Sequence, residues 1–466
     1  MRSFGHGPTL AAASLLLCGG LSLSASGRPA GAFDHSKFHI GVLCFNEDLC
    51  DDAHVRELAD CGIDNVQGKL SDKGKSFLAK YGVYVRGESP FPTFWGPSVY
   101  GQMQKVREHG GVEALEKRYP FERYVKAAEA YRPRSNEWSY NIGDEMSVRE
   151  FPYLARIVNL AREKHPDCEP HINHHPCWQR GNRVEWHLGT NYVDMIRAYC
   201  RTVPTDYVSY DFYLYEFGLK DPKNAANNLK LRDFGTARYL DNLRIVADAC
   251  RDNGRMFDFI AGVNAQQEAF EVTEQMIRYQ AYTAMAFGVQ KLSWACWSKG
   301  WWHRNVVDTN GVRTAQYERL RTVNRELRAF CDEYIRYRRV GTQFAGFTGR
   351  AAKWLEPSPE VFYPQQNFNA SSPLSTVFFT EIAATDGLPL VVSDFEPRVP
   401  DRSRGLFICA ADDPWDENPV ERTVRFRTPR RVRVFGGQGK IPCEKGADGF
   451  YTVRIRSNSG VFVVGE

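Results

Sequence analysis

Two carboxyl groups stand side by side in the segment Asn141-Ile142-Gly143-Asp144-Glu145. A carboxyl group with a raised pKa can protonate a leaving oxygen, while a second carboxylate serves as nucleophile or base. Cleavage of a glycosidic bond uses these two roles; Glu145 suits the proton donor, and Asp144 suits an acceptor for a sugar hydroxyl. In the alternative interpretation, both acids belong to the start of the next helix, where they interact favourably with the helix dipole.

The second acid of such a pair has two candidates. Asp211 lies in the run 209–213 (SYDFY), and Glu268 is the first carboxylate after the run 261–267 (AGVNAQQ). We prefer Asp211 because it ends a predicted strand, with Tyr210 beside it as a substrate contact. A purely structural hydrogen bond from loop amides to Asp211 is equally compatible with the pattern.

A cluster of polar rings and amides follows the predicted fifth strand. His171, Asn173, His174 and His175 resemble metal ligands by type. Alternation along a strand sends His171 and Asn173 to one face and His174 to the other, so they do not converge on one ion. We expect no metal and no cofactor, and we assign Asn173 and His175 to hydrogen bonds with sugar hydroxyls, with ordinary packing as the alternative.

Aromatic side chains are numerous, with 10 Trp, 22 Tyr and 29 Phe. Apolar faces of sugars stack on such rings, although most aromatic residues of a large protein serve its core. Trp297, Trp301 and Trp302 follow the predicted eighth strand, and Trp95 lies in the loop after the third. We expect one of these four, Trp95, Trp297, Trp301 or Trp302, to stack on a sugar, and not all of them together.

The elements that must position these residues alternate in type along the chain. Apolar runs typical of buried strands alternate eight times with amphipathic stretches at helical spacing. The predicted strands are 38–45, 63–66, 83–86, 138–142, 170–174, 207–213, 256–263 and 291–297. The predicted helices are 51–62, 71–82, 121–131, 151–164, 192–200, 237–253, 273–287 and 317–337. Eight such units predict an α/β fold, a closed (β/α)8 TIM barrel, in which the candidate residues share the C-terminal ends of the strands.

A second unit follows the barrel. After Val340 the helical spacing disappears, and short alternating runs appear at 407–410, 422–426, 432–435, 451–455 and 460–464. This pattern is typical of a small antiparallel, β-sandwich-like domain. We therefore divide the chain into a leader (1–32), a barrel (33–339) and a C-terminal β domain (340–466).

Several of these segments together resemble bacterial glycoside-hydrolase barrels of the clan that includes family 42 β-galactosidases. They are Gly143-Asp144-Glu145, Phe151-Pro152-Tyr153-Leu154, Ile172-Asn173, Ser209–Tyr213 and Gln280–Gly288. The resemblance implies that Glu145 is the acid/base, that Trp297 lies beneath the reacting ring, and that the substrate is a β-linked sugar such as a galactoside. The clan has Asn-Glu where this chain has Asp144-Glu145, and its strand-seven glutamate is absent here. A barrel that binds glycans without cleaving them is therefore the alternative function.

Composition and the N-terminus limit the remaining possibilities. A net charge of +4 with dispersed basic residues argues against a nucleic-acid partner. Arg2, the apolar run 10–23 and the small residues 30–32 are typical of an export signal, which predicts a secreted or periplasmic protein without a membrane span. Lipid attachment at Cys18 is the weaker alternative. The 12 cysteines show no paired spacing, so we expect buried free thiols, with Cys44–Cys50 as one possible local bridge.

Overall fold

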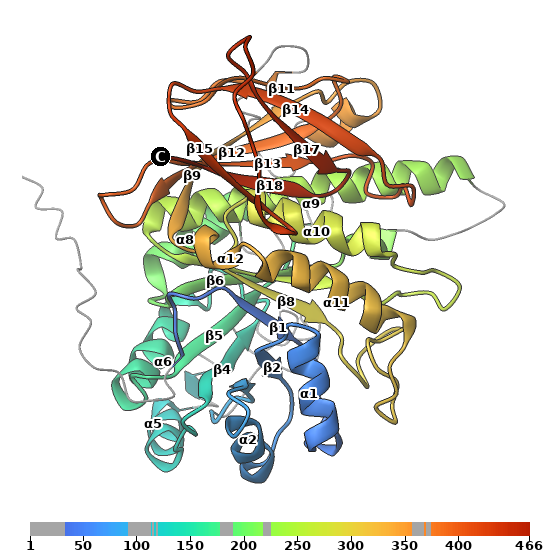
Figure 1. Cartoon of the computed structure of the whole chain (residues 1–466). Coiled ribbons are helices and arrows are strands. Elements are labelled where there is room, and N and C mark those ends of the chain that lie inside the picture. Colours follow the sequence, from blue (N-terminus) through green and yellow to red (C-terminus); the bar gives the residue numbers. More distant parts are fainter. Residues whose placement is uncertain are drawn as a thin grey trace, which may run out of the picture.

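The computed structural model describes residues 33–91, 113, 116–117, 120–177, 190–217, 225–356, 368–369 and 374–466. Eight parallel strands close into a barrel in sequence order, and helices surround it (Figure 1). The strands are β1 (His39–Val42), β2 (Asn65–Gln67), β3 (Tyr84–Gly87), β4 (Glu137–Asp144), β5 (Glu169–His174), β6 (Tyr207–Phe212), β7 (Met256–Gly262) and β8 (Lys291–Ala295). The predicted TIM barrel is confirmed. The leader 1–32 with Cys18, and also Trp95, lie outside the described residues.

Helices follow the strands at the predicted places. They are α1 (Asp52–Asp60), α2 (Asp72–Ala79), α5 (Phe121–Ala130), α6 (Phe151–Lys164), α8 (Tyr192–Thr202), α9 (Ala225–Asn253), α10 (Glu274–Ala286), α11 (Ala315–Arg328) and α12 (Cys331–Tyr334). Gly62 and Gly288 stop α1 and α10 at φ values of 74° and 83°, which side chains disfavour. In the part of the chain that the structure describes, no helix combines the length and apolar character that a membrane crossing needs.

Two boundaries differ from the sequence prediction. Helix α9 begins at Ala225, well before the predicted 237. The prediction missed its first turns because they lie outside the amphipathic stretch from which the helix was predicted. The prediction of a helix through 337 is wrong at its end, since α12 stops at Tyr334 and strand β9 (Tyr337–Ala345) starts immediately afterwards. Its Val340 and Phe344 alternate with polar residues, and β9 pairs antiparallel with β12 over its whole length.

The C-terminal strands form two sheets, as predicted. A seven-stranded sheet has the order β10-β9-β12-β13-β18-β15-β16, and a three-stranded sheet has the order β11-β14-β17. The remaining strands are β10 (Phe368–Asn369), β11 (Thr380–Ala384), β12 (Leu390–Pro397), β13 (Gly405–Ala410), β14 (Glu421–Arg427), β15 (Val432–Gly436), β16 (Gly439–Ile441), β17 (Tyr451–Arg456) and β18 (Gly460–Gly465). The domain boundary at 339/340 falls within β9 and stays a prediction.

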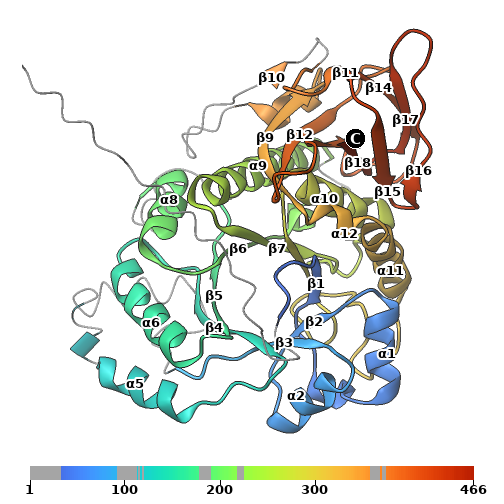
Figure 2. The same cartoon turned by 60° about the vertical axis from the view of Figure 1, so that its left-hand side comes forward.

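The large sheet packs on both of its faces because its side chains alternate. Val391 and Phe407 join the barrel's hydrophobic core, whereas Val392 and Ile408 join a second core against the small sheet. Helix α10 lies between the barrel and the large sheet, and both views show it there (Figures 1 and 2). Every residue of α10 after Glu274 is buried.

Charged side chains fill the inside of the barrel at half height. Asp258 on β7 accepts hydrogen bonds from Arg86 of β3 and from Lys291 of β8, the latter at 3.2 Å. All three side chains are at most 1% exposed. Burial alone would raise the pKa of Asp258, but Lys291 and Arg86 lower it below its usual value. The aspartate therefore stays ionised beside Arg86, while burial and the Arg86 charge lower the pKa of Lys291 to about 7.

An aromatic layer closes the barrel below these charges. The Arg86 guanidinium and the Lys291 ammonium lie 5.2 and 5.3 Å from the ring centre of Trp138. Phe33 stacks on the same indole, with centroids 4.0 Å apart and planes inclined by 14°. Phe33 and Trp138 thus cover the N-terminal end of the barrel interior, and the open end lies at the other side.

Replacing Asp258 should destabilise the fold strongly. Asp258→Asn leaves Arg86 and Lys291 buried without a counter-charge, which should cost about 3–5 kcal/mol of the free energy of unfolding. Urea denaturation at pH 7 measures this cost. The matched control is Asp72→Asn, which breaks the solvent-exposed pair with Arg134 and should change the midpoint very little. Equal midpoints for the two variants would contradict the assigned role of Asp258.

Candidate functional site

A cavity of about 1020 Å³ opens at the C-terminal ends of the barrel strands. Its wall includes residues from the ends of β1 to β7 and from the loop after β8. Among them are Asp144, Glu145, Asn173 and Asp211, so the structure brings together four of the residues singled out from the sequence. This size lies at the upper end of the range of small-molecule sites, and it suits a sugar chain better than a single small metabolite.

The end of β4 places the paired acids in this cavity. The pairing of β4 with β5 shifts register between Asn141 and Gly143. Glu145 then adopts a left-handed backbone with φ of 52°, and its N–H donates to the Asn173 carbonyl at 2.7 Å. A non-glycine residue held in this conformation often marks a functional position. The alternative of a helix start is wrong, because α6 begins only at Phe151.

Asn173 connects the acid of β4 with that of β6. Its Nδ2 donates to Asp144 Oδ1 at 3.3 Å and to Asp211 Oδ1 at 3.0 Å. The Ser209 hydroxyl donates to Asn173 Oδ1 at 3.3 Å, which fixes the orientation of the amide. Both contacts are made by the same Nδ2 atom. The distance between Asp144 Oδ1 and Asp211 Oδ1 therefore cannot exceed the sum of the two contact distances. Asn173 is therefore a positioning residue for both acids.

The three acids differ in proton affinity. Burial first, and then the charges of Asp211 and Asp144, raise the pKa of Glu145 to about 9. Burial and Asp211 raise the pKa of Asp144 to about 6, although its side chain remains accessible to water within the cavity. Burial also raises the pKa of Asp211, but hydrogen bonds from Asn173 and Tyr213 oppose that rise. Near neutral pH, Glu145 holds a proton while a carboxylate stands beside it.

The end of β7 places no acid in the cavity wall. Ile260 faces the cavity, and Gly262 is the next residue of the strand on that face. A Cβ at Gly262 would lie 3.2 Å from Cδ1 of Tyr213, which itself lines the cavity. The Tyr213 side chain therefore occupies the space in front of the end of β7. Gly262 at the end of the strand could have indicated this contact from the sequence alone. The sequence prediction did not include it.

Glu268 is not brought to the site. Its side chain is exposed and lies outside the cavity wall, and its main-chain carbonyl accepts a hydrogen bond from Arg304 Nε at 2.8 Å. The loop after β7 carries Glu268 away from the barrel axis, because Ala265 pairs with His303 in an isolated bridge. Asp211 is consequently the better placed of the two candidates for a second acid.

Two further assignments are corrected by burial. Tyr210 is fully buried with its ring 5.1 Å from that of Phe259, because strand alternation turns it away from the barrel axis. His175 is 6% exposed, and its Nδ1 lies 2.6 Å from the Pro176 carbonyl. Neither residue lines the cavity. The prediction that His171 and Asn173 share the face opposite His174 is confirmed, since only the first two line the cavity.

Of the four tryptophans named from the sequence, Trp301 forms the aromatic wall of the cavity. Trp301 lines the cavity, is 40% exposed, and has its ring 5.8 Å from that of Tyr213. Trp302 lies behind, with its ring 5.1 Å from the same tyrosine. Trp297 is fully buried against Tyr317, so it cannot stack on a ligand. The loop after β8 turns between these residues, and strand alternation does not extend into it.

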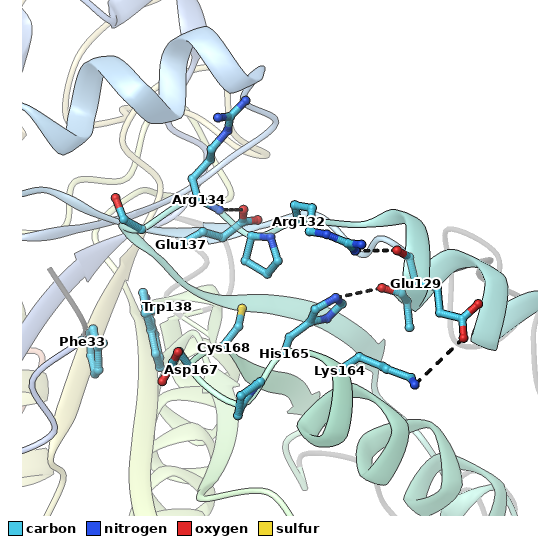
Figure 3. A pocket seen from close by; sticks show the side chains of 14 residues that line it. Phe33, Glu129, Arg132, Arg134, Glu137, Trp138, Lys164, His165, Asp167 and Cys168 are labelled. Carbon is cyan, nitrogen blue, oxygen red and sulfur yellow. Dashed lines mark hydrogen bonds and ion pairs between the residues drawn. The ribbon is translucent and has the colours of Figure 1, made fainter. Parts of the chain in front are cut away.

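A second cavity, of about 480 Å³, lies at the opposite end of the barrel (Figure 3). Glu137 in its wall already binds Lys75 Nζ at 2.9 Å, and the His165 ring lies 2.9 Å from the Tyr140 hydroxyl. Figure 3 also shows Lys164 paired with Glu129. These groups satisfy one another, so this cavity offers no convergent pair of acids. Among the described residues, no group of three His, Cys, Asp or Glu side chains is placed to hold a metal ion.

No family model and no curated protein matches this chain. Among solved structures, a variant of a glycoside hydrolase family 5 mannosidase from Rhizomucor miehei has 11% identity and a TM-score of 0.44, over 64% of this chain and 95% of its own. A glucosidase from Croceicoccus marinus has 10% identity and a TM-score of 0.38, over 94% and 98%. A family 10 xylanase from Thermobacillus composti has 13% and 0.38, over 62% and 97%. At such identities and TM-scores these likenesses do not indicate the activity of this protein. Evidence for an activity comes from the residues of the site.

The proton affinity of Glu145 should depend on its neighbours in a fixed order. Asp211→Asn should lower the pKa of Glu145 from about 9, because a repelling negative charge is removed. Asp144→Asn should lower the pKa less, since Asp144 contributes less to the rise. Carbon-13 NMR of labelled glutamate carboxyls follows this titration. Glu268→Gln is the control, and an unchanged Glu145 pKa in Asp211→Asn would disprove the coupling.

Proposed function

We propose that this protein is a glycoside hydrolase that cleaves a sugar chain in the cavity at the C-terminal end of its barrel. The observation that carries the proposal is the convergence of Glu145 with Asp144 and Asp211, one acid protonated and one ionised at neutral pH. Carboxyl groups with separated pKa values on one cavity are the requirement of acid-assisted glycoside cleavage.

In the proposed reaction Glu145 donates its proton to the glycosidic oxygen as the bond from that oxygen to the anomeric carbon breaks. The Asp211 carboxylate either attacks the anomeric carbon or removes a proton from an attacking water. In both routes water supplies the hydroxyl of the product sugar. In the nucleophilic route the ionised Glu145 takes the proton of the water that hydrolyses the ester on Asp211. In the general-base route Asp211 takes that proton, and exchange with solvent returns Glu145 to its protonated form and Asp211 to its ionised form. Asn173 and Tyr213 support Asp211 in this role, because their hydrogen bonds favour its ionised form.

The substrate we propose is a β-linked sugar, such as a galactoside, in a glycan outside the cytoplasm. The linkage and the sugar rest on the sequence resemblance, and the location rests on the leader-like first 32 residues. The exposed indole of Trp301 supports a pyranose ring as ligand, since such rings stack their C–H faces on aromatic side chains. Asp144, accessible within the cavity, would accept a sugar hydroxyl.

A second candidate function is glycan binding without cleavage. The observation in its favour is Gly262, which puts no carboxylate on the cavity side of the β7 end and packs against Tyr213 instead. A protein of this kind would keep the aromatic wall and the acids as hydrogen-bond acceptors. The same experiment separates the two functions.

Hydrolysis of a panel of aryl β-glycosides tests the first function. Wild type should turn over at least one sugar, and Glu145→Gln and Asp211→Asn should each reduce kcat/KM by roughly 10²–10⁴-fold. Glu145→Gln should impair phenyl glycosides more than dinitrophenyl glycosides, since a dinitrophenolate leaves without being protonated. Glu268→Gln, an acid outside the cavity, should keep wild-type activity.

Two other outcomes would contradict this function. If no aryl sugar is turned over while calorimetry detects galactoside binding that Trp301→Ala weakens, the protein binds glycans without cleaving them. Wild-type activity in Glu145→Gln would remove Glu145 from the mechanism.

The activity should depend on pH through two different acids. Glu145 must be protonated, so kcat/KM should fall as pH rises through about 9. Asp211 must be ionised, so activity should also fall at acid pH, above the ordinary aspartate range because burial raises the pKa of Asp211. A profile of kcat/KM from pH 4 to pH 10 measures both limbs. A basic limb near the ordinary glutamate range would contradict the assignment of the donor.

A further inference from the structure

A third cavity, of about 240 Å³, lies between the barrel and the C-terminal sheet. Its wall includes Met256 and Phe257 at the start of β7, the end of α9, and residues of β9 and β12. The proposed active site lies at the other end of β7, beyond Gly262. This interdomain pocket is therefore separate from the catalytic cavity and has under a quarter of its volume.

Arginines dominate the charge of the interdomain pocket. Its lining includes Arg251, Arg255, Arg338, Arg339 and Arg398. In the described parts of the chain, three nearby carboxylates pair with some of these groups: Asp248 with Arg251 and Arg339, Asp252 with Arg251, and Glu396 with Arg338. Five guanidinium groups against three carboxylates leave two positive charges in excess.

Two of the arginines retain donors for a ligand. Arg339 is 6% exposed; its Nε and Nη2 are used by Thr342 and Asp248, but its Nη1 finds no hydrogen-bond partner among the described residues. A buried guanidinium N–H without an acceptor is costly, so a missing acceptor is expected there. Arg398 is exposed and donates its Nε–H to the Ile335 carbonyl. Although the residue as a whole is exposed, protein atoms surround its head group, and this burial, together with the nearby Arg338 charge, lowers the pKa of Arg398.

We propose that the interdomain pocket binds a compact oxyanion, a phosphate or a sulfate group, held by Arg398, Arg338 and the free Nη1 of Arg339. Guanidinium groups bind such tetrahedral anions through directed, charge-assisted hydrogen bonds. The small volume excludes an oligosaccharide and admits one oxyanion or the sulfate ester at the end of a sugar. Because β9 and β12 belong to the C-terminal sheet and α9 to the barrel, the bound anion would join the two units.

Calorimetry with three probes tests the site on the full chain. Inorganic phosphate, galactose 6-sulfate and neutral galactose are titrated at constant ionic strength, after the catalytic cavity has been measured separately with aryl glycosides. We expect saturable one-site binding of at least one anionic probe beyond any binding of neutral galactose. Tighter binding of galactose 6-sulfate identifies a glycan sulfate ester as the ligand, and tighter binding of phosphate identifies the free ion.

Two variants assign the binding to this pocket. Arg398→Gln and Arg338→Gln should each weaken the anion affinity by about tenfold or more. Arg134→Gln, which removes an exposed arginine far from the pocket, should leave the affinity unchanged. Absence of saturable anion binding, or wild-type affinity in both Arg398→Gln and Arg338→Gln, would overturn the proposal. Hydrolysis of aryl glycosides by both variants should equal that of wild type, so the two proposals fail independently.

Discussion

The charged interior of this barrel depends on one buried carboxylate, that of Asp258. Arg86 from β3 and Lys291 from β8 both approach the barrel axis, where neither charge could stay unpaired. The aspartate between them connects three strands across the barrel and stands above the Trp138 layer. The cavity at the C-terminal ends of the strands lies beyond this level, and Arg86 forms part of its wall. The catalytic geometry thus rests on an ion cluster that takes no part in the proposed chemistry.

The interior of the barrel and its open end affect the pKa of carboxyl groups in opposite ways. Around Asp258 the cations lower the pKa and keep the group ionised. Around Glu145 the neighbours are acids, so burial and repulsion both raise its pKa. Asn173 and Tyr213 supply neutral hydrogen bonds to Asp211 where a cation would cancel the effect. The contrast explains how one barrel holds both a permanently charged aspartate and a protonated glutamate.

The sequence predicted the features that follow the regular spacing of residues in strands and helices. The order of strand ends placed Glu145, Asn173 and Asp211 together, and alternation along β5 put His171 and Asn173 on one face. The assignment of Tyr210 failed within β6, because alternation was not applied there. The other failures lie where the chain leaves regular structure. The loop after β8 turns Trp301 inward and Trp297 into the core, and the loop after β7 carries Glu268 outward. Those directions depend on tertiary contacts such as that between Tyr213 and Gly262, which no local period encodes.

Helix α10 belongs to the barrel by order but is covered by the C-terminal sheet, so it has no solvent-facing side. A barrel helix of an autonomous domain would keep a polar stripe toward water. The two units therefore share one interior, and removal of the β domain would expose the face of α10 that now packs against β12 and β13.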